Sequence, residues 1–208
     1  MYPNFKEEKI LWEKGFKNVV GLDEAGRGPL AGPVVAGAVL IKRDCDFLVE
    51  GINDSKKLSE KQREILYKKI IKNKNIKWGV GIVSEKVIDK INILEATKLA
   101  MERALRQAQG KPKLKADFLL LDGNFRLYCA TPQRAIIKGD QKVISIAAAS
   151  IIAKVTRDRI MEKFHKKYPQ YGFDKHKGYG TALHFKMIKK YGACPIHRKT
   201  FYPINAIK

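Results

Sequence analysis

Three aspartates each follow an apolar segment of the kind that forms a buried strand. They are Asp23 after residues 19–22, Asp122 after residues 118–121 and Asp140 after residues 136–139. Because strand ends in α/β sheets gather in one crevice, we expect these carboxylates to lie together. Clustered carboxylates raise one another's pKa unless a cation neutralises them. Hard oxygen ligands suit Mg²⁺ or Mn²⁺, so the pattern predicts a divalent-metal site.

Such a site is suited to phosphodiester hydrolysis. Two ions about 3.5–4 Å apart would activate the attacking water on one side and stabilise the leaving oxygen on the other. Any one of these acids taken alone is better explained as a turn or capping residue, because Asp before Gly marks turns and acids cap strands and helices. The prediction therefore depends on what surrounds them.

The segment Gly21–Pro33 supplies that context. It reads Gly-Leu-Asp-Glu-Ala-Gly-Arg-Gly-Pro-Leu-Ala-Gly-Pro, and its four glycines and two prolines constrain the backbone more than a solvent turn requires. Glycines let the backbone approach a ligand closely, and Arg27 can reach a phosphate or a nucleobase. The segment lacks the GxGxxG and Gly-Lys-Ser/Thr patterns, which excludes a dinucleotide or P-loop site.

The charge balance favours a polyanionic partner. The chain has 42 Lys and Arg residues against 21 Asp and Glu residues, a formal net charge of +21. This excess should attract nucleic acid and release its counterions. A lysine-rich solvated surface would give the same balance, so charge does not separate an enzyme from a passive binder.

Other residue types exclude several classes. The three widely spaced cysteines offer no disulfide framework, and the four histidines lack a zinc-type pair with an acidic partner. No apolar run approaches the roughly 20 residues needed to cross a bilayer, and residues 1–9 are polar rather than signal-like. We expect reduced thiols, no zinc, and a soluble cytoplasmic protein without membrane contact.

The chemistry-bearing residues are spread among alternating elements. Strands are expected over residues 19–23, 34–41, 78–83 and 118–121, with a shorter one at 135–137. Helices are expected over residues 59–71, 92–109, 143–168 and 181–191, two of them starting at capping boxes at Ser59 and Asn92. The alternation predicts an α/β fold in a single domain, residues 1–208, with a small helical C-terminal extension from about residue 170.

Several blocks resemble the ribonuclease HII family, the type 2 branch of the ribonuclease H superfamily. The segment Gly21–Pro33 is similar to the signature of that family. Further similar blocks follow in the family's order and extend the resemblance from about Val19 to His184: Asp54-Ser-Lys-Lys-Leu58, Leu121-Asp-Gly123, Lys138-Gly-Asp140, Ser145 to Asp158, and Lys177-Gly-Tyr-Gly-Thr181.

The resemblance implies a mixed sheet flanked by helices, the RNase H-like fold, and an endonuclease that hydrolyses the RNA strand of RNA–DNA hybrids. It also implies cutting beside single ribonucleotides in duplex DNA, leaving a 3′-hydroxyl and a 5′-phosphate. The metal-binding and catalytic acids that it carries over are Asp23, Glu24, Asp122 and Asp140. Mg²⁺ or Mn²⁺ is the implied cofactor, and the implied state is a monomer.

The resemblance also implies recognition of the sugar. Gly26-Arg27-Gly28 would recognise the ribose 2′-hydroxyl mainly through backbone groups, and Tyr179 would pack on the adjoining deoxyribose. These roles agree with chemistry, since the 2′-hydroxyl distinguishes RNA from DNA and an aromatic face tolerates any sequence.

Two further segments carry weaker signals. In Asp54-Ser-Lys-Lys57, Ser55 and Lys56 are expected to hold a backbone phosphate, although a polar loop before a helix would look the same. The small and β-branched residues of Ser145 to Asp158 indicate tight packing, with Lys154, Arg157 and Ser150 as secondary candidates for phosphate contact. His184 is expected to order the loop that carries Tyr179.

Two alternatives remain at this point. Members of the related type 3 branch carry a sizeable extra N-terminal domain and usually Glu as the fourth acid, whereas 18 residues precede Val19 and the fourth acid is Asp140. A non-catalytic basic nucleic-acid-binding protein would leave the acids at the strand ends unexplained. Loss of cleavage with retained duplex binding in Asp23→Asn would exclude it.

Overall fold

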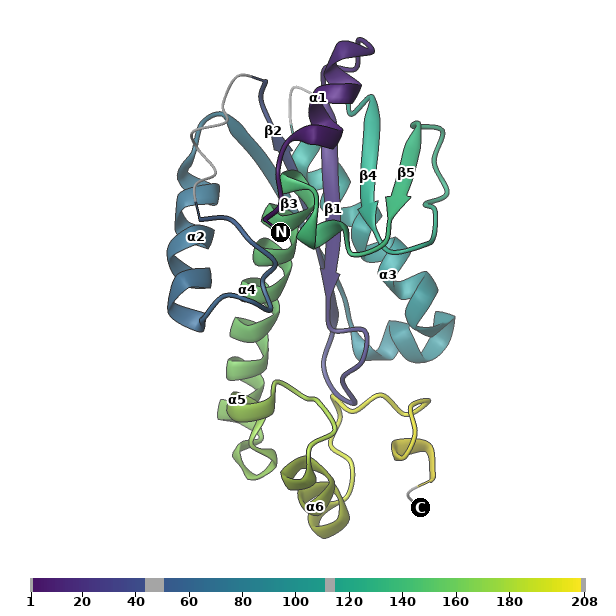
Figure 1. Ribbon diagram of the computed structural model, residues 1–208. Coiled ribbons are helices and arrows are strands. Elements are labelled where there is room, and N and C mark those ends of the chain that lie inside the picture. Colours follow the sequence, from purple (N-terminus) through teal and green to yellow (C-terminus); the bar gives the residue numbers. More distant parts are fainter. Residues whose placement is uncertain (1, 44–50, 111–114, 207–208) are drawn as a thin grey trace.

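The strands form one mixed sheet in the computed structural model, which describes residues 2–43, 51–110 and 115–206 (Figure 1). The strands are β1 (Val19–Ala25), β2 (Val34–Ile41), β3 (Ile76–Val83), β4 (Phe118–Asp122) and β5 (Gln133–Ile136). Their order is β3-β2-β1-β4-β5. The pairs β1–β2 and β2–β3 are antiparallel, while β1–β4 and β4–β5 are parallel. The predicted α/β class is confirmed.

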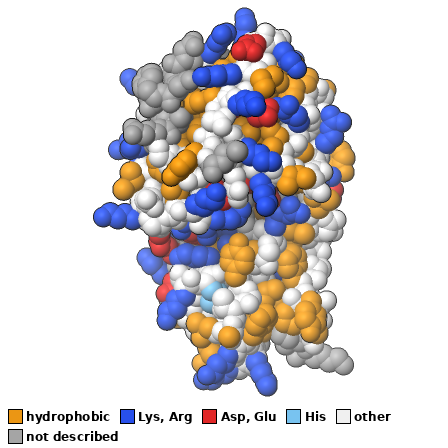
Figure 2. All heavy atoms as spheres, in the orientation of Figure 1, with side chains coloured by type: hydrophobic (Ala, Val, Ile, Leu, Met, Phe, Trp, Pro, Cys, Tyr) orange, Lys and Arg blue, Asp and Glu red, His pale blue; other side chains and the backbone are white. Residues whose placement is uncertain are grey.

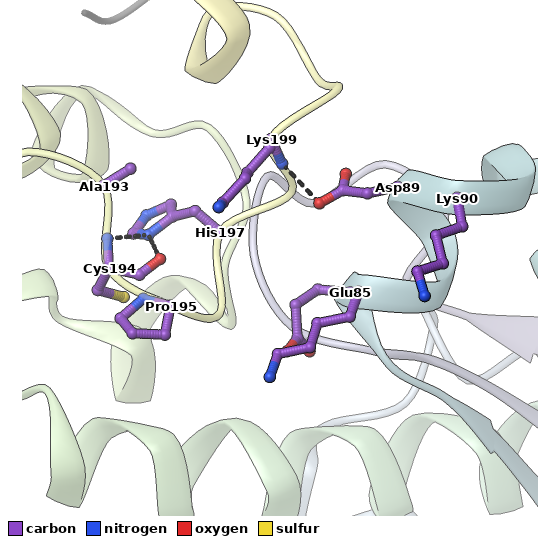
Figure 3. Close-up of a pocket in the computed structure, with 9 residues that line it drawn as sticks. Glu85, Asp89, Lys90, Ala193, Cys194, Pro195, His197 and Lys199 are labelled. Atoms are coloured by element: carbon purple, nitrogen blue, oxygen red, sulfur yellow. Dashed lines mark hydrogen bonds between the residues drawn. The ribbon is translucent and has the colours of Figure 1, made fainter.

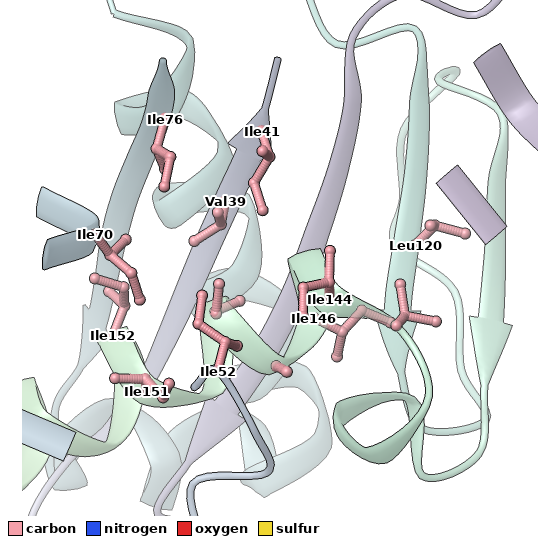
Figure 4. Close-up of a cluster of buried hydrophobic side chains, with 14 of the residues drawn as sticks. Val39, Ile41, Ile52, Ile70, Ile76, Leu120, Ile144, Ile146, Ile151 and Ile152 are labelled. Carbon is pink, nitrogen blue, oxygen red and sulfur yellow. The ribbon is translucent and has the colours of Figure 1, made fainter. Parts of the chain in front are cut away.

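Helices cover both faces of this sheet (Figure 1). The helices are α1 (Lys6–Glu13), α2 (Glu60–Lys72), α3 (Glu85–Gln109), α4 (Ile144–Lys167), α5 (Phe173–His176) and α6 (Ala182–Tyr191). Short 3-10 turns are η2 (Gly139–Gln141), η3 (Pro169–Tyr171) and η4 (Ile204–Ala206). One core lies between the sheet and α1, α2 and α4, where isoleucines such as Ile70, Ile146 and Ile152 interdigitate (Figure 4). A second core lies between the sheet and α3.

Local sequence explains several element boundaries. Ser59 and Gln62 form the predicted capping box at the start of α2. Asn92 caps the second part of α3, because its Oδ1 accepts the N–H groups of Leu94 and Glu95. The preceding residues 85–91 are also helical, which the pattern did not predict, and the chain kinks at Asn92 with φ +64°. Helix α1 was likewise missed in a stretch interpreted as polar.

Glycines allow helices to lie directly on the sheet. A Cβ atom at Gly37 of β2 would overlap the backbone oxygen of Ala149 in α4, and one at Gly81 of β3 would overlap that of Ala100 in α3. The small residues of α4 complete this close approach, so the prediction of tight packing for that helix is confirmed.

Two predicted strand ends are wrong. Strand β1 continues to Ala25, so Asp23 lies within the strand and pairs in register with Gly37. Strand β5 ends at Ile136, and Asp140 lies in η2 instead of at a strand end. Within the described ranges, no helix is long and apolar enough to cross a membrane.

The chain after α4 builds a small third core on the end of α4 and on the loop between β1 and β2. Its buried residues are Leu30, Ala31, Met161, Tyr171, Phe173, Ile188, Ile196 and Ile204. Thr181 caps α6, because its side chain accepts the N–H of His184. This C-terminal extension lies at the lower end of the molecule in Figure 1.

Candidate functional site

Three carboxylates meet where β1, β4 and η2 converge. Oxygen atoms of Asp23, Asp122 and Asp140 all lie within 4.8 Å of one another. Parallel pairing of β1 with β4 brings Asp23 beside Asp122, since Leu22 is in register with Leu121. The N–H of Gly139 donates to Asp122 Oδ1 at 2.6 Å, which fixes η2 against the end of β4. This all-oxygen donor set fits a hard divalent cation.

The electrostatics of the three acids favour a bound cation. Asp23 and Asp140 are 4% and 2% exposed. Burial raises the pKa of Asp23 well above its ordinary range, and the charges of Glu24, Asp122 and Asp140 raise it further. Burial and the charge of Asp122 also raise the pKa of Asp140. A positive ion between these groups would remove this penalty.

Glu24 stands outside that group of three. Neighbouring residues of a strand point to opposite faces, and the Glu24 carboxylate contacts the Arg27 guanidinium at 3.4 Å. Burial raises the pKa of Glu24 to about 7; the charge of Arg27 lowers it and that of Asp122 raises it. Its Oε2 atom is buried without a hydrogen-bond partner in the described part of the chain. This acceptor is therefore available to a ligand near Asp122.

The loop before α2 adds a cation and a further acid. Lys56 Nζ lies 3.3 Å from Asp140 Oδ2, with most of the side chain exposed. Asp54, which is 2% exposed, accepts the N–H of Lys56 at 2.9 Å and the side-chain amide of Gln141 at 3.2 Å. Sequence reasoning gave Asp54 no role, because an aspartate before Ser-Lys has the pattern of an ordinary turn.

Ser55, predicted with Lys56 to hold a phosphate, is almost fully buried. It is 5% exposed, and its N–H donates to Ser150 Oγ at 3.4 Å while its carbonyl accepts from Arg63. These bonds tie the loop to α4 and α2. Because the residue is 5% exposed, the Ser55 hydroxyl has little surface for a phosphate.

The glycine loop, residues 26–33, lies beside Tyr179. Gly26 adopts φ +98°, and a side chain there would overlap Arg157. Arg27 and Gly28 are exposed, and a Cβ atom at Gly28 would lie 3.7 Å from the Tyr179 ring. Backbone bonds from Leu30 to Gly178 and from Gly32 to Ile196 attach the loop to the C-terminal extension. The predicted sugar-binding residues are thus brought together.

Two of the secondary phosphate candidates are wrong. Arg157 is 1% exposed and donates to backbone carbonyls, and Ser150 is 3% exposed and accepts from Ser55. Lys154 pairs with Asp158 at 2.7 Å. Residues of α4 face the protein interior here, because the small side chains around them bring the helix close to the sheet.

His184 orders the Tyr179 loop, as predicted, and does so within a chain of neutral histidines. His184 Nδ1 lies 2.9 Å from the Tyr179 carbonyl and Nε2 lies 3.0 Å from His197 Nε2. The N–H of Cys194 donates to His197 Nδ1, so His197 donates through Nε2 to His184, which donates to Tyr179. Burial lowers the pKa of His184 and of His197 to about 4.

The face of the molecule shown in Figure 2 is rich in basic side chains. Lys and Arg side chains spread over the face shown in Figure 2 and outnumber acidic ones there. A phosphate backbone approaching this face would meet positive charge, which is consistent with the net charge of +21.

Comparison with known proteins identifies the family. Residues 20–203 match the family model described as Ribonuclease HII. A ribonuclease HII of Chlamydia trachomatis serovar A is 54% identical over 204 residues, covering 96% of this chain and 91% of that protein. The crystal structure of ribonuclease H2 from Pyrococcus horikoshii OT3 superposes with a TM-score of 0.73 at 33% identity, covering 91% of this chain and 96% of that one.

The type 3 alternative is less similar in sequence. A structure of Bst-RNase HIII in complex with Mn²⁺ superposes with a TM-score of 0.73 at 16% identity, covering 91% of this chain and 68% of that one. This likeness shows a shared fold alone. On the family match and the 54% identity to a type 2 enzyme, the chain belongs to the ribonuclease HII family and is an endonuclease of the ribonuclease H class.

Proposed function

We propose that this protein hydrolyses the RNA strand of RNA–DNA hybrids and cuts beside single ribonucleotides in duplex DNA, using two divalent cations. The observation that carries this proposal is the adjacency of two features. The cluster of Asp23, Asp122 and Asp140 is built on the same strand that leads into the glycine loop. A hydrolytic centre beside a sugar-reading loop selects ribonucleotides.

The acids would hold the metal ions. Asp23, Asp122 and Asp140 supply carboxylate oxygens, and Glu24 adds the buried acceptor Oε2. When bound, Mg²⁺ or Mn²⁺ supplies Lewis acidity for attack by water and for departure of the 3′-oxygen. Lys56, beside Asp140, would place positive charge near the phosphate. Because the 3′-oxygen departs from the phosphorus, cleavage would leave a 3′-hydroxyl and a 5′-phosphate.

Sugar selection would come from backbone groups of Gly26, Arg27 and Gly28. Tyr179, 47% exposed and adjacent to Gly28, would pack on the following deoxyribose. An aromatic face packs on a sugar whatever the base, so the RNA-to-DNA junction would be sensed without sequence preference.

The test is cleavage by Asp122→Asn. The substrates are a duplex DNA with one ribonucleotide and an all-RNA strand hybrid, each assayed in Mg²⁺ and in Mn²⁺. We expect cleavage of both to fall at least ~10²-fold, the order for removing one charge-stabilising group from an active site. Duplex affinity should persist.

The matched control is Glu102→Gln, an acid of α3 outside the site, which should cleave normally. Full activity in Asp122→Asn would refute the metal centre. Binding without cleavage by the wild-type protein would favour the non-catalytic alternative.

A further inference from the structure

Two arginines are buried against the glycine loop. Arg157 of α4 is 1% exposed and Arg198 of the C-terminal extension is 0% exposed. Among the described residues, no carboxylate forms an ion pair with either guanidinium. A buried charge without compensation is costly, so the groups that receive these donors must be strong acceptors.

Backbone carbonyls are those acceptors, and all lie in the glycine loop except the Lys177 carbonyl, which accepts from Arg157 Nη1 at 2.9 Å. Arg198 donates through Nε to Gly32 O at 3.0 Å, through Nη1 to Arg27 O at 2.9 Å and through Nη2 to Gly26 O at 2.5 Å. Arg157 donates through Nε to Pro33 O at 3.0 Å and through Nη2 to Ala31 O at 3.1 Å. The rigid, planar fork of a guanidinium presents five donors in fixed directions, which lets one side chain bind several separated carbonyls at once.

The carbonyls that Arg198 binds determine where the N–H groups of the following residues point. In a planar trans peptide the C=O and the next residue's N–H point in opposite directions. Because Gly26 and Arg27 turn their carbonyls toward Arg198, the N–H groups of Arg27 and Gly28 face away from it. Both residues are exposed, and neither N–H donates to another described residue. Two consecutive donors therefore face solvent beside Tyr179.

Arg198 is itself held on both sides. His197 Nδ1 accepts the N–H of Cys194 at 2.9 Å, and the N–H groups of Lys199 and Thr200 donate to the Asp89 carboxylate of α3 at 3.0 Å (Figure 3). A cavity of about 590 Å³ lies between this segment and α3, and the bonds to Asp89 connect its two sides. Helix α3 thus supports the segment that carries Arg198 through Asp89.

We propose that Arg198 is a positioning residue for ribose selection: it turns the glycine loop so that the N–H groups of Arg27 and Gly28 meet the 2′-hydroxyl oxygen. Arg157 holds the second half of the loop in the same way. A cation on the carbonyl also polarises the peptide, which strengthens its N–H as a donor. Burial lowers the pKa of Arg198 to about 9, so the group is still charged at pH 7. The inference rests on the proposed role of the glycine loop.

The test measures ribose preference instead of activity. An Asp122→Asn background slows cleavage at least ~10²-fold. Dissociation constants in Mg²⁺ are then compared for a duplex DNA with one ribonucleotide and the same all-DNA duplex. Arg198→Lys keeps the charge and loses the fork. It should reduce the preference for the ribonucleotide about tenfold, the order given by one or two lost hydrogen bonds, with affinity for the all-DNA duplex changed less than about twofold.

Arg159→Lys is the matched control, because Arg159 pairs with Glu64 away from the loop and should keep the full preference. Circular dichroism checks the fold, and Arg198→Gln replaces Arg198→Lys if the latter does not fold. If a folded variant keeps the full ribose preference, or loses affinity equally for both duplexes, the role proposed for Arg198 is wrong and the proposed function still stands. If the Asp122→Asn protein with Arg198 intact binds both duplexes equally, the proposed role of the glycine loop is wrong as well.

Discussion

Glu24 provides a quantitative test of the acidic centre, through the substitution Glu24→Gln in metal-free protein. Its folded-state pKa of about 7 lies above the ordinary value of 4.5. The folded state therefore binds the extra proton between these values, and stability is lost as pH rises from 4.5 through 7. At about 1.4 kcal/mol per pH unit, the carboxylate destabilises the metal-free fold by about 3 kcal/mol at pH 8.

Glutamine removes that penalty and also the ion pair with Arg27. The Arg27 side chain is 43% exposed, so losing the pair costs less than about 1 kcal/mol. We expect a net gain of about 2 kcal/mol in the free energy of unfolding at pH 8, or roughly 4–8 °C in Tm for a chain of this size. At pH 5 the gain should shrink to less than about 1 kcal/mol, because the wild-type carboxyl is then largely protonated in the fold.

The assay is thermal unfolding by circular dichroism in EDTA at pH 8 and pH 5, with Glu102→Gln as control. Adding Mg²⁺ should stabilise the wild type more than Glu24→Gln, since the variant has less negative charge to neutralise. A variant no more stable than the wild type at pH 8, or equally stabilised at both pH values, would refute the electrostatic account of this site.

Two further predictions concern the C-terminal extension. Tyr179→Ala should weaken cutting at a lone ribonucleotide more than cutting within a long hybrid, measured as the ratio of kcat/KM on the two substrates; equal losses would contradict junction sensing. The pair His184 and His197 has folded-state pKa values of about 4, below the ordinary 6.5, so its contribution to stability is complete above pH 6.5 and is lost as pH falls toward 4. By pH 5 the loss is about 2 kcal/mol per histidine. Hydrogen exchange of residues 176–184, corrected for intrinsic rates, should show less protection at pH 5 than at pH 7, and unchanged protection would exclude this titration.

Much of the fold and part of the site were accessible from local sequence. The β-branched runs of β2 and β4 and the capping box at Ser59 are short-range signals, because burial pattern and cap chemistry act within a few residues. Asp23 and Asp122 could be placed together by pattern, since parallel neighbours bring their ends to one edge. The family resemblance added the roles that residue types alone left open.

Tertiary structure decided the remainder. Whether the Glu24 carboxylate joins those of Asp23, Asp122 and Asp140 depends on which face of β1 it occupies. The position of Asp140 depends on a turn that the Asp122 carboxylate holds in place. Most of all, Arg157 and Arg198 bind carbonyls of the glycine loop that are 124 to 172 residues away in sequence. Backbone carbonyls are the same at every residue, so no sequence pattern marks them as partners; only the folded chain brings them to these guanidinium groups.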